Sequence, residues 1–279
     1  MLQKGRQFLH HMWYTSINTS FFLIITIFIC HDVCFLSKST RDREQLTWVR
    51  RNIGEIITCK HFSNITHLFT FTGANEGATF ERLSHCKLNK IYNNSCLLEE
   101  EARCIQSIPT IKTIRLQMDS LEPLFKTFPG LKVIHLIRDP RGMLESRLRL
   151  GFGKGKELYV LAREICSRYK RDLDAAKTLM QLYPNRSKMV AYENIATNPL
   201  EMSRDIYSFL SLTFTSSIEQ WIKHATSLGS KHNGNFKTVR PNSTHVAYGW
   251  KERLTIENIQ SIDRECNYLY QELGYKPGL

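Results

Sequence analysis

The pattern of apolar and polar positions predicts strands and helices that follow one another along the chain. A near-continuous apolar run, KVIHLI, covers residues 132–137 and is typical of a buried parallel strand. After it, apolar residues recur every three or four positions from about Glu157 to Tyr183, which predicts a long amphipathic helix. Such alternation indicates an α/β domain with a mainly parallel sheet flanked by helices.

Shorter segments extend this pattern on both sides. The remaining strands are predicted at residues 67–72, 112–116 and 188–192. The remaining helices are predicted at residues 122–128, about 140–150, 199–212, 217–226 and 257–273, with a polar loop at 227–243.

The first apolar run, FFLIITIFIC, lies at residues 21–30. Extended to residues 13–36 it is long enough to span a bilayer, and Lys4 and Arg6 precede it, as in a type II signal anchor. We therefore expect a cytosolic tail at 1–12, an anchor at 13–36, a stem or divergent segment at 37–60 and the main domain at 61–279. A cleaved signal peptide and a buried helix of the domain are the alternatives.

The amino-acid composition indicates how large a core the chain can form and which kinds of binding partner suit its charge. The chain has 279 residues, of which 42% are hydrophobic, so one sizeable core can form. A formal net charge of +12 favours an anionic partner, such as a nucleotide, an acidic glycan, a membrane surface or nucleic acid. No zinc-finger or RNP-type motif supports nucleic-acid binding, and GxxxxGK[S/T] is absent, which excludes a P-loop kinase or GTPase.

Cysteines and glycosylation motifs indicate the compartment. Eight cysteines occur without CxxC spacing or an adjoining histidine cluster, so we expect no zinc site. Cys86, Cys96 and Cys104 lie close together and could form disulfides in an oxidising lumen, or remain free thiols. Five N-x-S/T triplets together with these cysteines favour the secretory pathway; they begin at Asn18, Asn64, Asn93, Asn185 and Asn242.

The candidate chemistry lies where the KVIHLI strand ends. Arg138 follows the strand, Asp139 is suited to cap a helix, and Pro140 to its first position. A helix N-terminus at the carboxyl end of a parallel strand attracts phosphate, and an arginine fork can bind its oxygens. Ser146 lies about two helical turns further on. The alternative is an ordinary capped helix with surface arginines.

The longer string LKVIHLIRDPRGMLESRL, residues 131–148, resembles the 3′-phosphate-binding segment of Golgi carbohydrate sulfotransferases. It is most similar to the galactose, N-acetylgalactosamine and N-acetylglucosamine 6-O-sulfotransferases. The resemblance runs from about residue 113 to residue 275. Further blocks carry it: IRLQMDSLEPLF, ICSRYKRDLDAA, AYENIATNP, VRPNSTHVAYGWKERL and IDRECNYLYQELGY.

This resemblance implies a P-loop-like sulfotransferase fold and transfer of sulfate from 3′-phosphoadenosine 5′-phosphosulfate to a sugar hydroxyl, at the 6-O position, without a metal. It implies a glycan acceptor and a Golgi membrane protein whose domain faces the lumen. Arg138 and Ser146 become ligands of the donor's 3′-phosphate. Arg240 becomes a second cation on the nucleotide, or a solvated loop arginine, whereas Trp250 is expected to pack in the core.

One family feature is not found in this sequence. The family binds the 5′-phosphosulfate with an R-x-G-S/T-S-F-like loop, which neither residues 51–54 nor residues 73–77 match. No catalytic base is assigned, although His67, Glu76, Glu81 and His85 lie in the region that could hold one. Two alternatives follow: a truncated or inactive nucleotide-binding pseudoenzyme, and a basic glycan-binding protein without chemistry.

Overall fold

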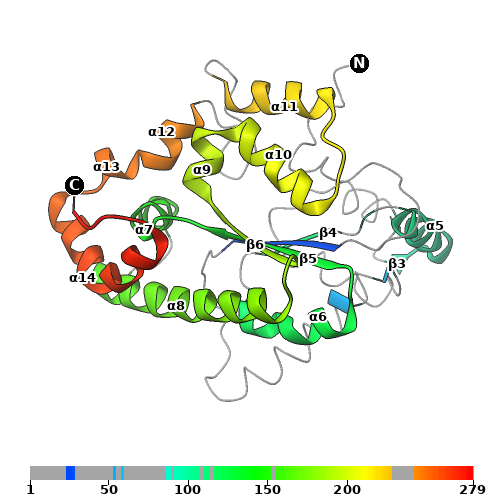
Figure 1. The fold of residues 1–279 in the computed structure, drawn as a ribbon, viewed down its shortest axis with the longest axis horizontal. Helices are drawn as coiled ribbons and strands as arrows, with labels where there is room; N and C mark the ends of the chain where they lie inside the picture. Colours follow the sequence, from blue (N-terminus) through cyan, green and yellow to red (C-terminus); the bar gives the residue numbers. More distant parts are fainter. Residues whose placement is uncertain are drawn as a thin grey trace.

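A small parallel sheet lies between two layers of helices (Figure 1). The computed structural model describes residues 23–28, 53–54, 58–59, 86–88, 91–106, 108, 110–113, 116–151, 155–227 and 242–278. The strands are β1 (Leu23–Phe28), β2 (Lys87–Leu88), β3 (Ile91–Tyr92), β4 (Thr110–Thr113), β5 (Leu131–Ile137) and β6 (Ser187–Ala191).

Helices cover both faces of this sheet (Figure 1), and the last helix ends at Leu273, near the carboxyl terminus. They are α5 (Asn94–Ile105), η4 (Met118–Leu121), α6 (Glu122–Thr127), α7 (Pro140–Arg149), α8 (Leu158–Leu182), α9 (Tyr192–Thr197), α10 (Pro199–Leu210), α11 (Ser216–Thr226), α12 (Ser243–Tyr248), α13 (Trp250–Arg253) and α14 (Ile256–Leu273). Figure 1 shows α6 and α8 on one face of the sheet and α10 on the other.

The main sheet has the strand order β4-β1-β5-β6, and all its pairs are parallel. This agrees with the α/β class that the alternating pattern predicts. Because β1 comes first in the chain and lies between β4 and β5, the strand order reverses beside it. Ligands of open α/β sheets bind outside the carboxyl ends of the strands at such a reversal. The expected binding edge is therefore where β1 and β5 end.

β1 differs from our prediction for this part of the chain. Residues 23–28 lie within the segment that we predicted as a signal anchor, and the structure pairs their backbone with β4 and β5. A short, β-branched apolar run suits a buried strand as well as a membrane helix, so hydropathy alone did not separate the two. The rest of segment 13–36 lies outside the described residues. Among the described helices, none has both the length and the apolar character that crossing a membrane requires.

Most of the predicted elements from β5 onward are confirmed within a residue or two. α7 begins at Pro140 with Asp139 as its N-cap, and α8 covers the long amphipathic stripe. The short helices α9, α12 and α13 were missed because each has too few turns to show a period. The predicted strand at residues 67–72 lies outside the described residues.

The C-terminal helix α14 packs along α8, which joins the end of the chain to the helix layer on one face of the sheet (Figure 1). Their shared core contains Ile165, Tyr169 and Leu269, and Cys166 is bonded to Cys266 across it. At the edge of this contact Arg163 binds Glu265 with nitrogen–oxygen distances of 2.8 and 3.1 Å. Apolar burial and the disulfide together hold α14 against α8.

Two more disulfides lie in the N-terminal half. Cys86 is bonded to Cys96, and Cys59 to Cys104. The prediction that Cys86, Cys96 and Cys104 form disulfides is confirmed, although Cys104 pairs with Cys59, which the sequence did not indicate. Disulfides persist in oxidising compartments, so these bonds favour a secretory-pathway protein.

Candidate anion-binding site at the end of β5

The junction between β5 and α7 is built by short-range bonds that the sequence encodes. The Asp139 carboxylate accepts the Arg141 backbone N–H at 2.9 Å, which caps α7. Pro140 occupies the first helical position, where a missing N–H costs nothing. The predicted cap and the predicted helix start are therefore both confirmed, and the positive end of the α7 dipole lies beside Arg138.

The backbone of Arg138 is fixed from α8. The Tyr169 hydroxyl accepts the Arg138 N–H at 2.8 Å and donates to the Arg138 carbonyl at 3.0 Å. Burial raises the pKa of Tyr169 well above its ordinary value, so the phenol keeps the proton that it donates. The Tyr169 side chain thereby satisfies both the N–H and the carbonyl of Arg138, where the strand ends. These two bonds fix the Arg138 backbone and leave its side chain free for other contacts.

The guanidinium of Arg138 has no carboxylate partner among the described residues. Its Cζ lies 4.6 Å from the centre of the Tyr192 ring, at the start of α9. Its Nε is buried and makes no hydrogen bond within the described part of the chain. A cation–π contact holds the group in place but leaves its buried Nε–H without an acceptor in the described part of the chain. A half-buried arginine with unsatisfied donors at a helix N-terminus is suited to bind an anion.

Ser146 lies on the same face of α7 as this guanidinium. A Cβ added to Gly142 would be 3.4 Å from Arg138 Nε and 3.5 Å from Nη2, so the arginine lies directly over this glycine. Residues four apart share a helix face, and side chains lean toward the N-terminus, so Ser146 follows Gly142 on that face. Arg138 thus contacts the position of Gly142, and helix spacing puts Ser146 next along that face; their role as phosphate ligands stays a prediction.

Arg141, three residues from Arg138, is used quite differently. Its Nε and Nη2 donate to the two Asp139 oxygens at 3.0 and 2.8 Å, and its Nη1 donates to the Gly278 carbonyl at 3.1 Å. The guanidinium also lies between two rings, 4.4 Å from Trp250 and 4.7 Å from Tyr270. With 4% of its side chain exposed, Arg141 is a structural residue that ties the C-terminus to α7.

Glu193 supports the same junction from α9. One of its oxygens accepts the Asp139 N–H at 3.0 Å and the other accepts the Tyr275 hydroxyl at 2.8 Å. Sequence reasoning did not assign Tyr169, Tyr192 or Glu193 to the site. The block AYENIATNP could have indicated Tyr192 and Glu193, because these two residues directly follow the end of β6.

Arg240, the third predicted ligand, lies outside the described residues and stays a prediction. The chain that follows it is anchored beside the site: Asn242 caps α12, and Ser243 Oγ donates to the Ala196 carbonyl of α9 at 2.6 Å. The region considered for a catalytic base, with His67, Glu76, Glu81 and His85, also lies outside the described residues. Trp250 is 2% exposed and packs in the core, as predicted.

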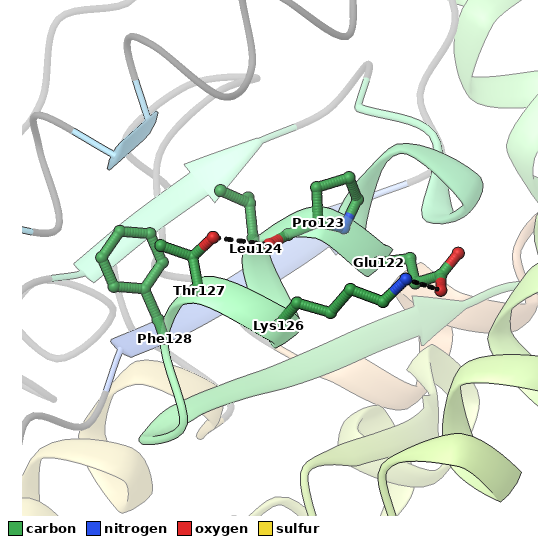
Figure 2. A pocket seen from close by; sticks show the side chains of 6 residues that line it. All are labelled: Glu122, Pro123, Leu124, Lys126, Thr127 and Phe128. Atoms are coloured by element: carbon green, nitrogen blue, oxygen red, sulfur yellow. Dashed lines mark hydrogen bonds and ion pairs between the residues drawn. The ribbon is translucent and has the colours of Figure 1, made fainter.

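A pocket of about 420 Å³ lies elsewhere, along α6 (Figure 2). Its charged side chains, Glu122 and Lys126, form an ion pair with each other at 2.8 Å, as Figure 2 shows. Phe128, another lining residue, comes just before the amino end of β5. Because ligands of such sheets bind at the carboxyl ends of strands, we assign no function to this pocket.

Comparison with known proteins gives the family context. A model described as "Sulfotransferase family" matches residues 49–216. Carbohydrate sulfotransferase 1 is 31% identical over 199 residues in Rattus norvegicus and over 186 residues in Homo sapiens, covering 64% and 60% of this chain. Human carbohydrate sulfotransferase 6 is 28% identical over 168 residues, 53% of this chain. The matches span 47%, 44% and 42% of these relatives, so the chain matches less than half of their length.

Solved structures show the same fold. The sulfotransferase domain of the Synechococcus PCC 7002 olefin synthase superposes with a TM-score of 0.54, covering 94% of this chain and 98% of that domain at 14% identity. The sulfotransferase domain from the curacin biosynthetic pathway gives a TM-score of 0.50, covering 92% of this chain and 99% of that domain at 15% identity. At these identities the likeness concerns the fold alone.

Proposed function

Because the chain belongs to the sulfotransferase family, we propose that it binds 3′-phosphoadenosine 5′-phosphosulfate, with the 3′-phosphate on Arg138 and Ser146. The observation that carries the proposal is the Arg138 guanidinium, held over the first turns of α7 with a buried Nε that has no partner among the described residues. A phosphate there would accept from the guanidinium and from the Ser146 hydroxyl. Arg240 is kept as a further proposed ligand.

The reaction that we propose is sulfate transfer to a sugar hydroxyl of a glycan, at the 6-O position. Its support is the naming of the relatives as carbohydrate sulfotransferases, together with the sequence blocks described above. Sulfuryl transfer needs positioned reactants and stabilisation of charge on the leaving phosphate, and protein cations and N–H groups can supply the second. The proposed reaction includes no metal.

We also propose a position for the counterpart of the family's 5′-phosphosulfate loop. The family's loop opens the first helix of the domain, and β1 is the first strand described here. Phe28, the last residue of β1, pairs with Leu136, two residues before Arg138, so β1 itself ends beside the proposed phosphate site. The segment that follows β1 is the proposed counterpart of the loop. Its sequence, CHDVCF at residues 30–35, aligns with R-x-G-S/T-S-F only at Phe35. The sequence has Cys30 in place of the arginine and Asp32 in place of the glycine.

This substitution favours the second candidate function, a nucleotide-binding chain with weak or absent transfer. A carboxylate in place of glycine opposes a phosphosulfate electrostatically, and a thiol does not replace a guanidinium. We therefore propose that the chain keeps the nucleotide site and transfers sulfate poorly. The non-catalytic glycan-binding alternative has the net charge of +12 as its support.

Calorimetric titration with two nucleotides tests the proposal. Adenosine 3′,5′-bisphosphate should bind the wild type more tightly than adenosine 5′-monophosphate, which lacks the 3′-phosphate. Arg138→Ala should weaken the bisphosphate by about 1.5–3 kcal/mol, the usual worth of a hydrogen bond to a charged group, and leave the monophosphate unchanged. Equal weakening of both nucleotides would mean that Arg138 is structural, and would overturn the assignment.

We also propose that the domain is located in the Golgi lumen. The three disulfides support an oxidising compartment, and Asn185 and Asn242 lie exposed for glycosylation. The anchor over residues 13–36 is not part of this proposal, because residues 23–28 cannot span a membrane while they pair in the sheet. Expression in secretory cells should yield a chain whose electrophoretic mobility shifts on glycosidase treatment; an unglycosylated cytosolic chain would contradict the location.

A further inference from the structure

Trp250 has a buried N–H group that its packing does not explain. The indole is the first side chain of α13 and is 2% exposed. Its Nε1 makes no hydrogen bond to any described residue. An indole N–H can only donate, and a buried donor without an acceptor costs free energy. Core packing accounts for the rings of Trp250, but a leucine or phenylalanine would fill a core without this cost.

The position of the indole relates this N–H to Arg138. A Cβ added to Gly142 would be 2.9 Å from Trp250 Cδ1, the carbon bonded to Nε1, and 3.4 Å from Arg138 Nε. The pyrrole edge of the indole and the guanidinium thus meet over one glycine, in the first turn of α7. Arg141 covers the face of the indole, with its Cζ 4.4 Å from the ring centre. The face of the indole therefore has Arg141 as a partner, whereas its N–H has no acceptor among the described residues.

α13 is also held rigidly against α7, which keeps the indole in this position. Arg253 Nε and Nη2 donate to the two Glu145 oxygens at 2.6 and 3.1 Å. Glu145 lies in α7, one residue before Ser146, and is 5% exposed. Glu145 is buried and Arg253 is exposed, and the bidentate geometry of the pair fixes both distance and orientation.

We propose that Trp250 is a further ligand of the 3′-phosphate, donating its indole N–H to the anion that Arg138 binds. This inference rests on the proposed function and adds the Trp250 side chain to Arg138 and Ser146 at that site. Arg138 Nε, just before α7, and Trp250 Nε1, in α13, are donors of different types that have no acceptor among the described residues and lie over the same glycine. The oxygens of one phosphate can accept from both. Trp250 would then distinguish nucleotides with a 3′-phosphate from those without one.

Trp250→Phe tests this, because phenylalanine keeps an aromatic ring in the core and removes the N–H. We expect adenosine 3′,5′-bisphosphate to bind the variant roughly tenfold more weakly, as for the loss of one hydrogen bond to a charged group. Binding of adenosine 5′-monophosphate should stay unchanged. Trp221→Phe, in α11, is the matched control and should alter neither affinity.

A second measurement covers the case in which Trp250→Phe folds poorly. In the wild-type protein, the indole N–H resonance of Trp250 should move on titration with the bisphosphate and stay in place with the monophosphate. If Trp250→Phe weakens both nucleotides equally, or the resonance responds to neither, Trp250 is structural and the inference fails while the Arg138 site stands. If the wild type does not distinguish the two nucleotides, the proposed function fails first.

Discussion

The carboxyl ends of β5 and β1 are neighbours in the sheet, yet the sequences that follow them are chemically opposite. After β5 come Arg138 and a capped helix, with donors that lack partners among the described residues. After β1 come Cys30 and Asp32, where the family's pattern has an arginine and a glycine. In our proposal the first end attracts an anion, and the sequence after the second end lacks the groups that would do so. The proposed function therefore predicts that nucleotide binding and sulfate transfer can be separated in this protein.

Removing Arg141 should have the largest effect, because it breaks the structure of the β5 end. Arg141→Ala removes the ion-pair partner of the buried Asp139 and of the half-buried Asp263. Loss of one partner of a buried pair costs about 3–5 kcal/mol of unfolding free energy. Denaturant unfolding of the disulfide-intact chain measures this. Arg138→Ala is the matched control and should cost about 1 kcal/mol or less, the scale of its cation–π contact. Equal losses in the two variants would contradict the division between a structural and a binding arginine.

Restoring the β1 end is the second test of the comparison. Cys30→Arg, Asp32→Gly, Val33→Ser and Cys34→Ser together rebuild the family's pattern in front of Phe35. By comparison with single oxyanion-site donors, we expect sulfate transfer to rise by roughly 10²–10³-fold, or about 3 kcal/mol. Labelled donor with glycan acceptors measures the rate. Cys34→Ser alone, which adds no cation, should leave it near the wild-type level.

Two results would contradict this prediction. Rapid transfer by the unmodified chain would mean that another segment replaces the loop. No gain in donor binding by the fourfold variant would mean that the segment after β1 does not face the donor, and that the register of β1 with β5 does not position the missing site.

Ser146→Ala should have the smallest effect. It removes one neutral hydroxyl donor to the phosphate, so the affinity for adenosine 3′,5′-bisphosphate should fall by about 1 kcal/mol, roughly fivefold. The affinity for adenosine 5′-monophosphate and the unfolding free energy should stay as in the wild type, because Ser146 is only half-buried. Ser167→Ala, on the exposed side of α8, is a suitable serine control. An effect of Ser146→Ala on both nucleotides would contradict its placement on the 3′-phosphate.

Local signals explain why the β5 half of the site was predictable. A continuous apolar run, a capping aspartate and a proline at the first helical position act over a few residues, and each gave the element that the structure contains. The partners of Arg138 could not be predicted in this way. Tyr169 and Tyr192 lie 31 and 54 residues away in the sequence, and only packing of α8 and α9 on the sheet brings them to it.

By itself, the sequence determined the α/β class, the position of Arg138 at a strand end, and the missing pattern of the phosphosulfate loop. Only the tertiary structure decided that residues 23–28 pair inside the sheet. It also decided that Arg141 is satisfied, while Arg138 Nε and Trp250 Nε1 have no acceptor among the residues that the structure describes. The physical reason is the range of each interaction. Capping and periodicity act between neighbours in the chain, whereas strand order and the pairing of buried charges depend on segments that meet only after folding.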